Sequence, residues 1–133
     1  MRRALQVVVL GRSMLPTLSP GDRLLAVRSG RVRRGDVWVV LHAGQFLVKR
    51  VVGLPRDRLL VADGEAKLAG SGRAADRSGP QPDGAWVLGP DEYLIQGDNR
   101  QESTDLQALG PVGADRLVGR VLFRYWPRPG PVR

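Results

Sequence analysis

The sequence predicts a mostly β fold, a sandwich or a coiled barrel formed by a single domain. Three observations support this prediction. Apolar and β-branched residues occur in short runs, turn-forming residues separate these runs at regular spacing, and the length of 133 residues suits one domain. A parallel sheet would instead require long amphipathic helical segments between the strands, and the sequence has no helical stripe of useful length.

Short apolar runs define the predicted strands, and Gly, Pro and Asp residues occupy the turns between them. Branched and aromatic side chains favour strands because they pack well on a pleated surface. In chain order, the predicted strands span residues 7–10, 23–28, 36–41, 45–52, 59–62, 93–96 and 117–125. The predicted turns fall at residues 19–22, 34–36, 43–44, 63–64 and 110–111.

Two segments lack a strand pattern. Residues 70–84 are rich in Gly, Ser, Pro, Ala and charge with almost nothing to bury, which predicts a surface loop or a mobile insertion. Residues 127–133 are proline-rich and predict an extended tail. We expect at most a single helical turn after Pro16 or within residues 112–117.

The composition excludes several kinds of catalytic site. Cysteine is absent, which rules out disulfides, thiol nucleophiles and cysteine-based zinc sites. A Ser/His/Asp triad or a histidine-bound metal would depend on the one histidine, His42, which lies in an apolar stretch. The simpler prediction places His42 at a strand end or in a hairpin.

The net charge of +8 comes almost entirely from arginine, because only Lys49 and Lys67 are lysines among the 21 basic residues. The basic residues are scattered, and no aromatic platform for nucleic-acid bases lies among them. We therefore favour a solvated, arginine-rich surface and expect no nucleic-acid partner. Attraction to nucleic acid or to anionic lipid is the alternative.

No run approaches the roughly 20 apolar residues that a membrane span requires. The apolar N-terminal stretch is shorter than a span and lacks the small-residue cleavage site of a signal peptide. We expect a soluble chain without a transmembrane segment, cytoplasmic or peripheral at a membrane. Met14, Leu15 and Trp38 are candidates for lipid contact, or equally for the wall of a peptide-binding cleft.

Ser13 is a candidate nucleophile in the segment Gly11-Arg12-Ser13-Met14-Leu15-Pro16-Thr17-Leu18. A serine hydroxyl reacts only when a base takes its proton, and its carbonyl adduct needs donors aimed at the oxyanion. At a junction between a strand and a turn, Ser13 can present both its hydroxyl and its backbone N–H to a bound peptide. Ser-x-x-Pro also occurs in ordinary turns.

Lys49 is a candidate general base in the predicted strand 45–52. Successive residues of a strand face opposite sides, so Lys49 shares a face with Leu47 and Val51. Burial disfavours the ammonium and lowers the pKa of a lysine toward the range useful for a base, which arginine cannot reach. The alternative is a lysine whose stem packs on the core while its amine reaches water.

A third segment runs from a predicted strand into the turn Gly97-Asp98-Asn99 and continues to Ser103 and Asp105. Gly, Asp and Asn tolerate the backbone conformations of tight turns. Asp98 is expected to pair with Arg50, which lies on the strand face opposite Lys49. A second hydroxyl near the lysine amine would orient its lone pair without adding charge.

Together, these three segments resemble the signal peptidase I family of membrane-linked serine proteases, the S26 peptidases. The segments 34–40 and 117–121 share the resemblance, which extends over residues 11–127 except the loop at 70–84. The resemblance implies a coiled, mostly antiparallel β-barrel or sandwich as the catalytic core. Some members have a large accessory β-subdomain, and the short region between Lys49 and Gly97 predicts that it is absent.

The resemblance also implies roles for particular residues. Ser13 matches the nucleophile and Lys49 the base, while Ser103 matches the serine that orients the lysine. The backbone N–H of Ser13 would be one oxyanion donor, and Asp98, Arg50 and Asp105 would support the site. Met14, Leu15 and Pro16 are expected to contact a substrate that bears a signal or leader peptide, with small residues before the cut. No metal or cofactor is expected.

Two residues depart from the family pattern. Gly11 stands where some members have a hydroxyl side chain as an additional oxyanion donor, although other members also have glycine there. Gln107 replaces the arginine of the family pattern Ser-x-Asp-Ser-Arg, which removes a salt-bridge partner of Asp105.

Three alternatives are open from the sequence. A small, anchor-free chain also resembles the nickel-type superoxide dismutase maturation protease, which trims the leader of one partner enzyme. Self-cleaving repressors share the Ser/Lys chemistry, but only twelve residues precede Ser13, too few for their DNA-binding helices. The third alternative is a non-catalytic β-barrel that binds anionic surfaces.

Overall fold

The computed structural model describes residues 4–28, 30–62, 65–70, 78–81, 84–99 and 110–133. These residues form antiparallel β structure without an α-helix, as predicted, and the one helical element among them is the 3₁₀ turn η1 (Ala114–Arg116). The strands are β1 (Ala4–Val8), β2 (Arg23–Val27), β3 (Val37–His42), β4 (Gln45–Gly53), β5 (Arg58–Ala62), β6 (Glu65–Gly70), β7 (Gly79–Pro80), β8 (Ala85–Val87), β9 (Glu92–Gln96), β10 (Val112–Gly113), β11 (Leu117–Trp126) and β12 (Gly130–Pro131).

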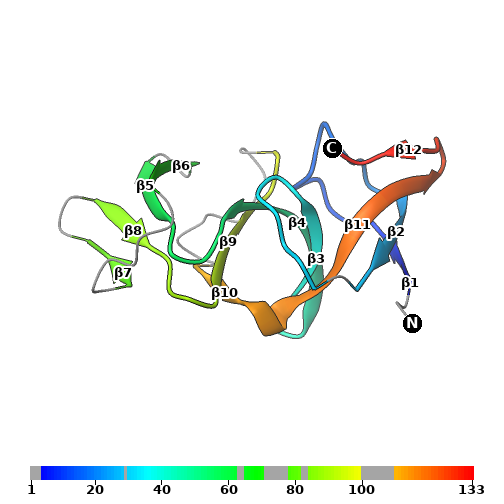
Figure 1. Ribbon diagram of the computed structural model, residues 1–133. Coiled ribbons are helices and arrows are strands. Elements are labelled where there is room, and N and C mark those ends of the chain that lie inside the picture. The colour runs from blue at the N-terminus through cyan, green and yellow to red at the C-terminus, as the bar shows by residue number, and fades with distance from the viewer. Residues whose placement is uncertain (1–3, 29, 63–64, 71–77, 82–83, 100–109) are drawn as a thin grey trace.

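The larger sheet has the strand order β1-β2-β11-β3-β4-β9-β10, with β12 paired to β11 outside this path. All of its pairings are antiparallel. The order ends at β1 on one side and at β10 on the other, so the described strands form a coiled, open sheet rather than a closed barrel. Figure 1 shows β1, β2 and both chain termini on one side of the molecule, away from β5 to β8.

The hairpin between β3 and β4 forms the middle of this sheet. Its turn consists of Ala43 and Gly44, whose φ angles of 49° and 76° are both positive, as a two-residue type I′ turn requires. The turn sets a register in which His42 lies opposite Gln45 and Trp38 opposite Lys49. His42 is therefore the last residue of its strand, as the sequence predicted.

Alternate residues of β3 belong to different hydrophobic clusters. Val37 and Val39 pack in a cluster with Leu24, Ala26 and Val121, while Trp38 and Val40 pack in a second cluster on the other face. The central strand is thus covered on both faces, which explains its continuous apolar run.

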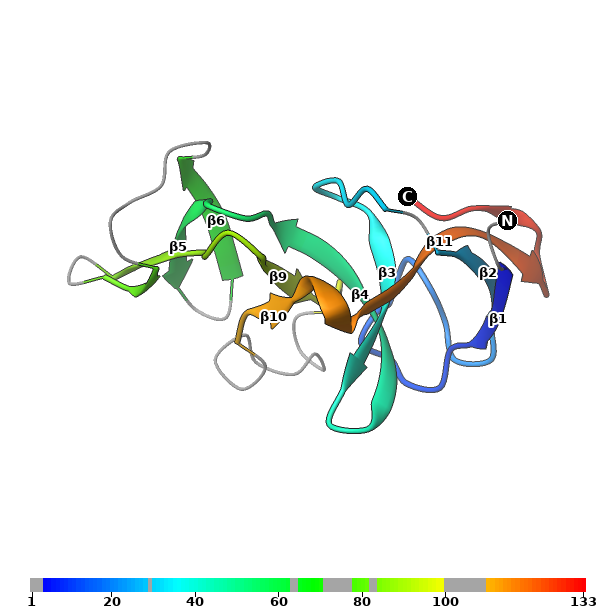
Figure 2. The same ribbon diagram turned by 60° about the horizontal axis from the view of Figure 1, so that its bottom comes forward.

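A smaller sheet, in the order β6-β5-β8-β7, extends beyond β4 and β9 (Figure 2). Its core contains Leu59 and Leu88, which pack with Leu94 of β9. Asp57, only 1% exposed, directly precedes β5 of this sheet. It accepts a hydrogen bond from the Leu54 N–H at 2.8 Å and forms an ion pair with Arg34.

The structure corrects several predicted boundaries. The first strand spans Ala4–Val8 rather than residues 7–10, because its pairing with β2 begins at Ala4 and ends at Val8. The expected loop at 70–84 contains β7, and the expected tail at 127–133 contains β12. Both are Gly-Pro pairs without alternation, and only the strand beside them makes them β structure. The helical turn expected within 112–117 is η1.

Three further strands and the small second sheet also differ from the sequence prediction. The strand β6 was missed because its six residues include no β-branched or aromatic side chain. The strands β8 and β10 were missed because three and two residues carry little periodic signal. The region between Lys49 and Gly97 was expected to lack a large accessory β-subdomain, and its described residues form the small four-stranded second sheet. The predicted turn at 63–64 lies outside the described residues.

Gly53 marks the junction of the two sheets, and its replacement tests how tightly they pack. A Cβ at Gly53 would lie 2.8 Å from Leu88 Cδ1 and 2.9 Å from Leu94 Cβ. We expect Gly53→Ala to lower the free energy of unfolding by about 1–3 kcal/mol through overpacking. Urea denaturation would measure the change. Gly70→Ala is the matched control, since a Cβ there would meet nothing within 4 Å; equal losses in both variants would contradict this packing.

Candidate active site

Lys49 lies in the middle of β4 and is 3% exposed. Burial alternates along the strand, so Lys49, Val51 and Gly53 are buried, while Arg50 and Val52 are half-buried. Desolvation by burial lowers the pKa of the Lys49 amine below its ordinary value. Its place on the buried face of the strand therefore makes the Lys49 amine easier to deprotonate than that of an exposed lysine.

Ser13 is half-buried in the turn that joins β1 to β2. The turn is closed by hydrogen bonds from the Leu15 N–H to the Arg12 carbonyl at 3.1 Å and from the Leu18 N–H to the Met14 carbonyl at 2.9 Å. Met14 and Leu18, each 1% exposed, anchor the turn in the hydrophobic core. Two buried side chains thus hold the segment that presents Ser13.

The segment after β9 connects the Ser13 turn to the strand of Lys49. β9 pairs with β4 so that Arg50 lies opposite Gln96, which brings Asp98 beside Arg50. Arg50 donates through Nε to Asp98 Oδ1 at 2.8 Å and through Nη2 to Asp98 Oδ2 at 2.7 Å. The pairing of Asp98 with Arg50 is therefore confirmed.

The segment that contains Asp98 and Asn99 also forms hydrogen bonds with the Ser13 turn. The Thr17 hydroxyl donates to Asp98 Oδ2. The Asn99 N–H donates to the Ser13 carbonyl at 2.7 Å, and Asn99 Nδ2 donates to the Arg12 carbonyl at 3.1 Å. Because these bonds span distant parts of the sequence, they fix the Ser13 backbone relative to β4 and β9.

Asp98 is ionised in this setting. Its burial opposes the charge, and this is the largest single effect on the pKa. Hydrogen bonds from Arg50 and Thr17, together with the charge of Arg50, outweigh the burial and hold the pKa of Asp98 below its ordinary value. The same pairing raises the pKa of Arg50.

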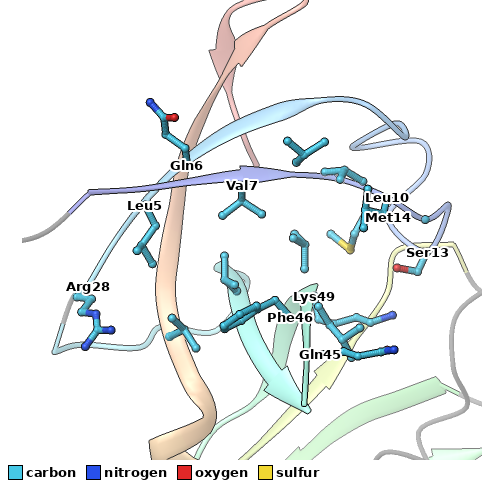
Figure 3. Close-up of a pocket in the computed structure, with 17 residues that line it drawn as sticks. Leu5, Gln6, Val7, Leu10, Ser13, Met14, Arg28, Gln45, Phe46 and Lys49 are labelled. Atoms are coloured by element: carbon cyan, nitrogen blue, oxygen red, sulfur yellow. The ribbon is translucent and has the colours of Figure 1, made fainter. Parts of the chain in front are cut away.

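Ser13 and Lys49 line the same pocket, a cavity of about 730 Å³ between β1 and the start of β4. Figure 3 shows both residues at one end of this pocket, where Met14 also lies. Most of the wall is apolar and comes from β1, β4 and Val39. The pocket is therefore mostly apolar, with the Ser13 hydroxyl and the Lys49 amine at one end and Arg28 at the other.

Only some of the other predicted site residues line the pocket. Met14 lines the pocket although it is almost fully buried, whereas Leu15 and Pro16 are not part of the lining. Lipid contact by Met14 and Trp38 was a wrong expectation, since Met14 is 1% and Trp38 2% exposed in the core. Ser103 and Asp105 lie outside the described residues, as does Gln107.

Thr17 and Asn99 were missed as contributors to the site. Both belong to segments that the sequence singled out, and both have side chains able to bond across a turn. Their hydrogen-bond partners depend on how the Ser13 turn packs against the segment after β9. A short stretch of sequence does not predict that packing.

Comparison with known proteins places the whole chain rather than single residues. The family described as signal peptidase, peptidase S26, matches residues 3–126. Signal peptidase IB of Staphylococcus aureus (strain Mu50 / ATCC 700699) is 31% identical over 147 residues, which cover 90% of this chain and 76% of that protein. The probable signal peptidase I-2 of Synechocystis sp. is 36% identical over 134 residues, which cover 88% of this chain and 61% of that protein.

The ion pair predicts how stability depends on pH. A carboxylate whose pKa is lowered by folding stabilises the protein above its unfolded pKa, near 3.9 for Asp, and loses this contribution as pH falls through the folded value. We expect Asp98→Asn to cost about 1–3 kcal/mol at pH 6 and less at pH 3, because charged hydrogen bonds are lost. Urea denaturation at both pH values measures this difference.

Asp91→Asn is the matched control, because Asp91 is exposed. It should show little change at either pH. An Asp98→Asn cost that stays the same from pH 6 to pH 3 would contradict the lowered pKa of Asp98.

Proposed function

The chain belongs to the signal peptidase family, peptidase S26, and on this premise we propose that Ser13 and Lys49 form the catalytic dyad that removes a signal or leader peptide. Family membership supports serine-type peptidase activity on polypeptides. One observation carries the assignment to these two residues: a half-buried serine and a buried lysine with a lowered pKa line the same pocket.

The burial of Lys49 supports its role as the base. An ammonium cannot accept a proton, so a lysine base must be neutral when substrate is bound. Desolvation lowers the pKa of Lys49 and so makes the neutral amine easier to reach. An arginine at the same position would remain charged at every pH the protein tolerates.

The proposed reaction is acyl transfer in two stages. Lys49 Nζ takes the Ser13 hydroxyl proton while Oγ bonds to the substrate carbonyl carbon, which gives a tetrahedral oxyanion. The carbon–nitrogen bond then breaks, and the Lys49 ammonium gives its proton to the leaving amine. In the second stage Lys49 takes a proton from water, the resulting hydroxide attacks the ester, and the proton returns to Ser13 Oγ.

Further groups complete this mechanism as proposals. The Ser13 backbone N–H serves as an oxyanion donor. The family resemblance assigns Ser103 to the orientation of the lysine amine and Asp105 to the support of its loop. Asp98 and Arg50 act through Thr17 and Asn99, because their hydrogen bonds hold the Ser13 turn in place.

The pocket suits an extended apolar peptide. β1 is at the end of the strand order, so its outer edge is available to a substrate backbone among the described strands. Met14 supplies apolar wall near the reacting end, and Leu15 and Pro16, which are not part of the lining, remain proposed substrate contacts. Family resemblance implies small residues directly before the cut. The dedicated maturation protease and the non-catalytic module gain no support from the relatives.

No helix in the described part of the chain combines the length and apolar character needed to cross a membrane. Exposed apolar side chains do occur beside the pocket, where Phe46 is 66% and Leu10 88% exposed. We propose that Phe46 and Leu10 contact the membrane surface when the substrate is membrane-bound.

Removal of either dyad residue tests the proposal. We expect Ser13→Ala and Lys49→Met each to reduce cleavage of a leader-bearing polypeptide by about 10³-fold or more, because each removes a reacting group. Mass spectrometry before and after incubation measures cleavage, and circular dichroism checks folding. Lys67→Met is the matched control, since Lys67 is the exposed second lysine. Full activity of Lys49→Met would eliminate Lys49 as the base.

The pH dependence of cleavage gives a second test. Because the reactive form of Lys49 is neutral, kcat/KM should rise with pH and level off above the pKa of Lys49. Burial lowers that pKa, so the midpoint of the rise should lie below the ordinary lysine value near 10.4. Initial rates over pH 5–10 provide the measurement. A rise centred on the ordinary value would show that Lys49 is not desolvated during catalysis.

A further inference from the structure

The pocket extends far beyond the reacting groups. Its lining follows β1 from Leu5 to Val8 and continues through Leu10 toward Ser13. Figure 3 shows Leu5 and Arg28 at one end, and Ser13 with Lys49 at the opposite end. A bound peptide therefore has a long wall to follow before it reaches the dyad.

Arg28 is the permanently charged cation among the described residues of this pocket. Among the described lining residues only Arg28 and Lys49 are basic, none is acidic, and burial favours the neutral form of Lys49. Arg28 follows β2 directly, and the pairing of Val27 with Ala4 places it beside the start of β1. It is exposed and has no carboxylate partner within the described part of the chain.

The length of the wall sets the spacing between Arg28 and the scissile bond. An extended strand advances about 3.3 Å per residue, so a peptide that follows β1 uses one residue for each residue of the wall. Leu5 and Ser13 are eight positions apart, and the turn after β1 shortens the path, so a substrate side chain near Leu5 would lie about five to seven residues from the one at Ser13. The apolar wall suits the apolar leader, which places these residues before the cut.

We propose that Arg28 forms a distal subsite for an acidic side chain of the leader, about five to seven residues before the scissile bond. The inference rests on the proposed function, because that function supplies the peptide and its direction. The guanidinium of arginine binds a carboxylate through two parallel hydrogen bonds. The described residues of the neighbouring wall include no carboxylate that would compete for Arg28. A lysine at the same substrate position would be repelled.

The test uses binding, so that it does not depend on cleavage. Labelled leader peptides, identical except for Glu, Gln or Lys at a position scanned from four to eight residues before the cut, are titrated into the Ser13→Ala protein. We expect Glu to bind about three- to tenfold more tightly than Lys at one position within this range, at low salt. Arg28→Gln should abolish the preference, and Arg28→Glu should reverse it.

Arg116→Glu provides the matched control, because Arg116 is exposed on η1, outside the pocket lining, and the substitution changes the net charge equally. This control should keep the preference for Glu. A preference that survives Arg28→Glu, or that Arg116→Glu removes equally, would overturn the subsite. Cleavage of the Gln peptide by the unmodified protein tests the proposed function separately, since the binding comparison needs no catalysis.

Discussion

The Asp98 carboxylate is the group on which the geometry of the site depends. It joins Arg50 of β4 to Thr17 of the Ser13 turn, while the adjacent Asn99 N–H bonds to the Ser13 carbonyl. Three segments that are distant in sequence therefore meet at one charge. A partly buried carboxylate is costly without partners, so the same bonds that position the turn also make the ionised form stable.

Neighbouring residues of β4 show how one strand creates two electrostatic environments. Arg50 faces the ion pair and stays charged, whereas Lys49 faces the buried side, and its amine becomes easier to deprotonate. The alternation of a strand allows this difference between adjacent positions. A permanent cation suits a fixed bridge, and a cation that can lose its proton suits proton transfer.

The open sheet explains why a peptide could reach this environment. A closed barrel would pair every strand edge, whereas here β1 ends the strand order and borders the pocket. The turn after β1 carries Ser13, so one segment supplies both the wall and the proposed nucleophile. The buried anchors Met14 and Leu18 keep that turn fixed although it lies at the sheet edge.

The sequence by itself determined the features that depend on neighbouring residues. The β class, the Ala43-Gly44 turn and the buried face of Lys49 follow from local propensity and from the alternation of a strand. The sequence also predicted the pairing of Arg50 with Asp98, although the two are distant in the chain, because both lie in segments that it singled out.

Only the tertiary structure decided the features that depend on distant contacts. Two-residue strands such as β7 and β12 exist because a longer strand lies beside them. The bond from Thr17 to Asp98, the burial of Met14 in the core and the position of Arg28 at the far end of the pocket require segments to cross. Such crossings are set by the packing of the whole sheet, which no short stretch of sequence encodes.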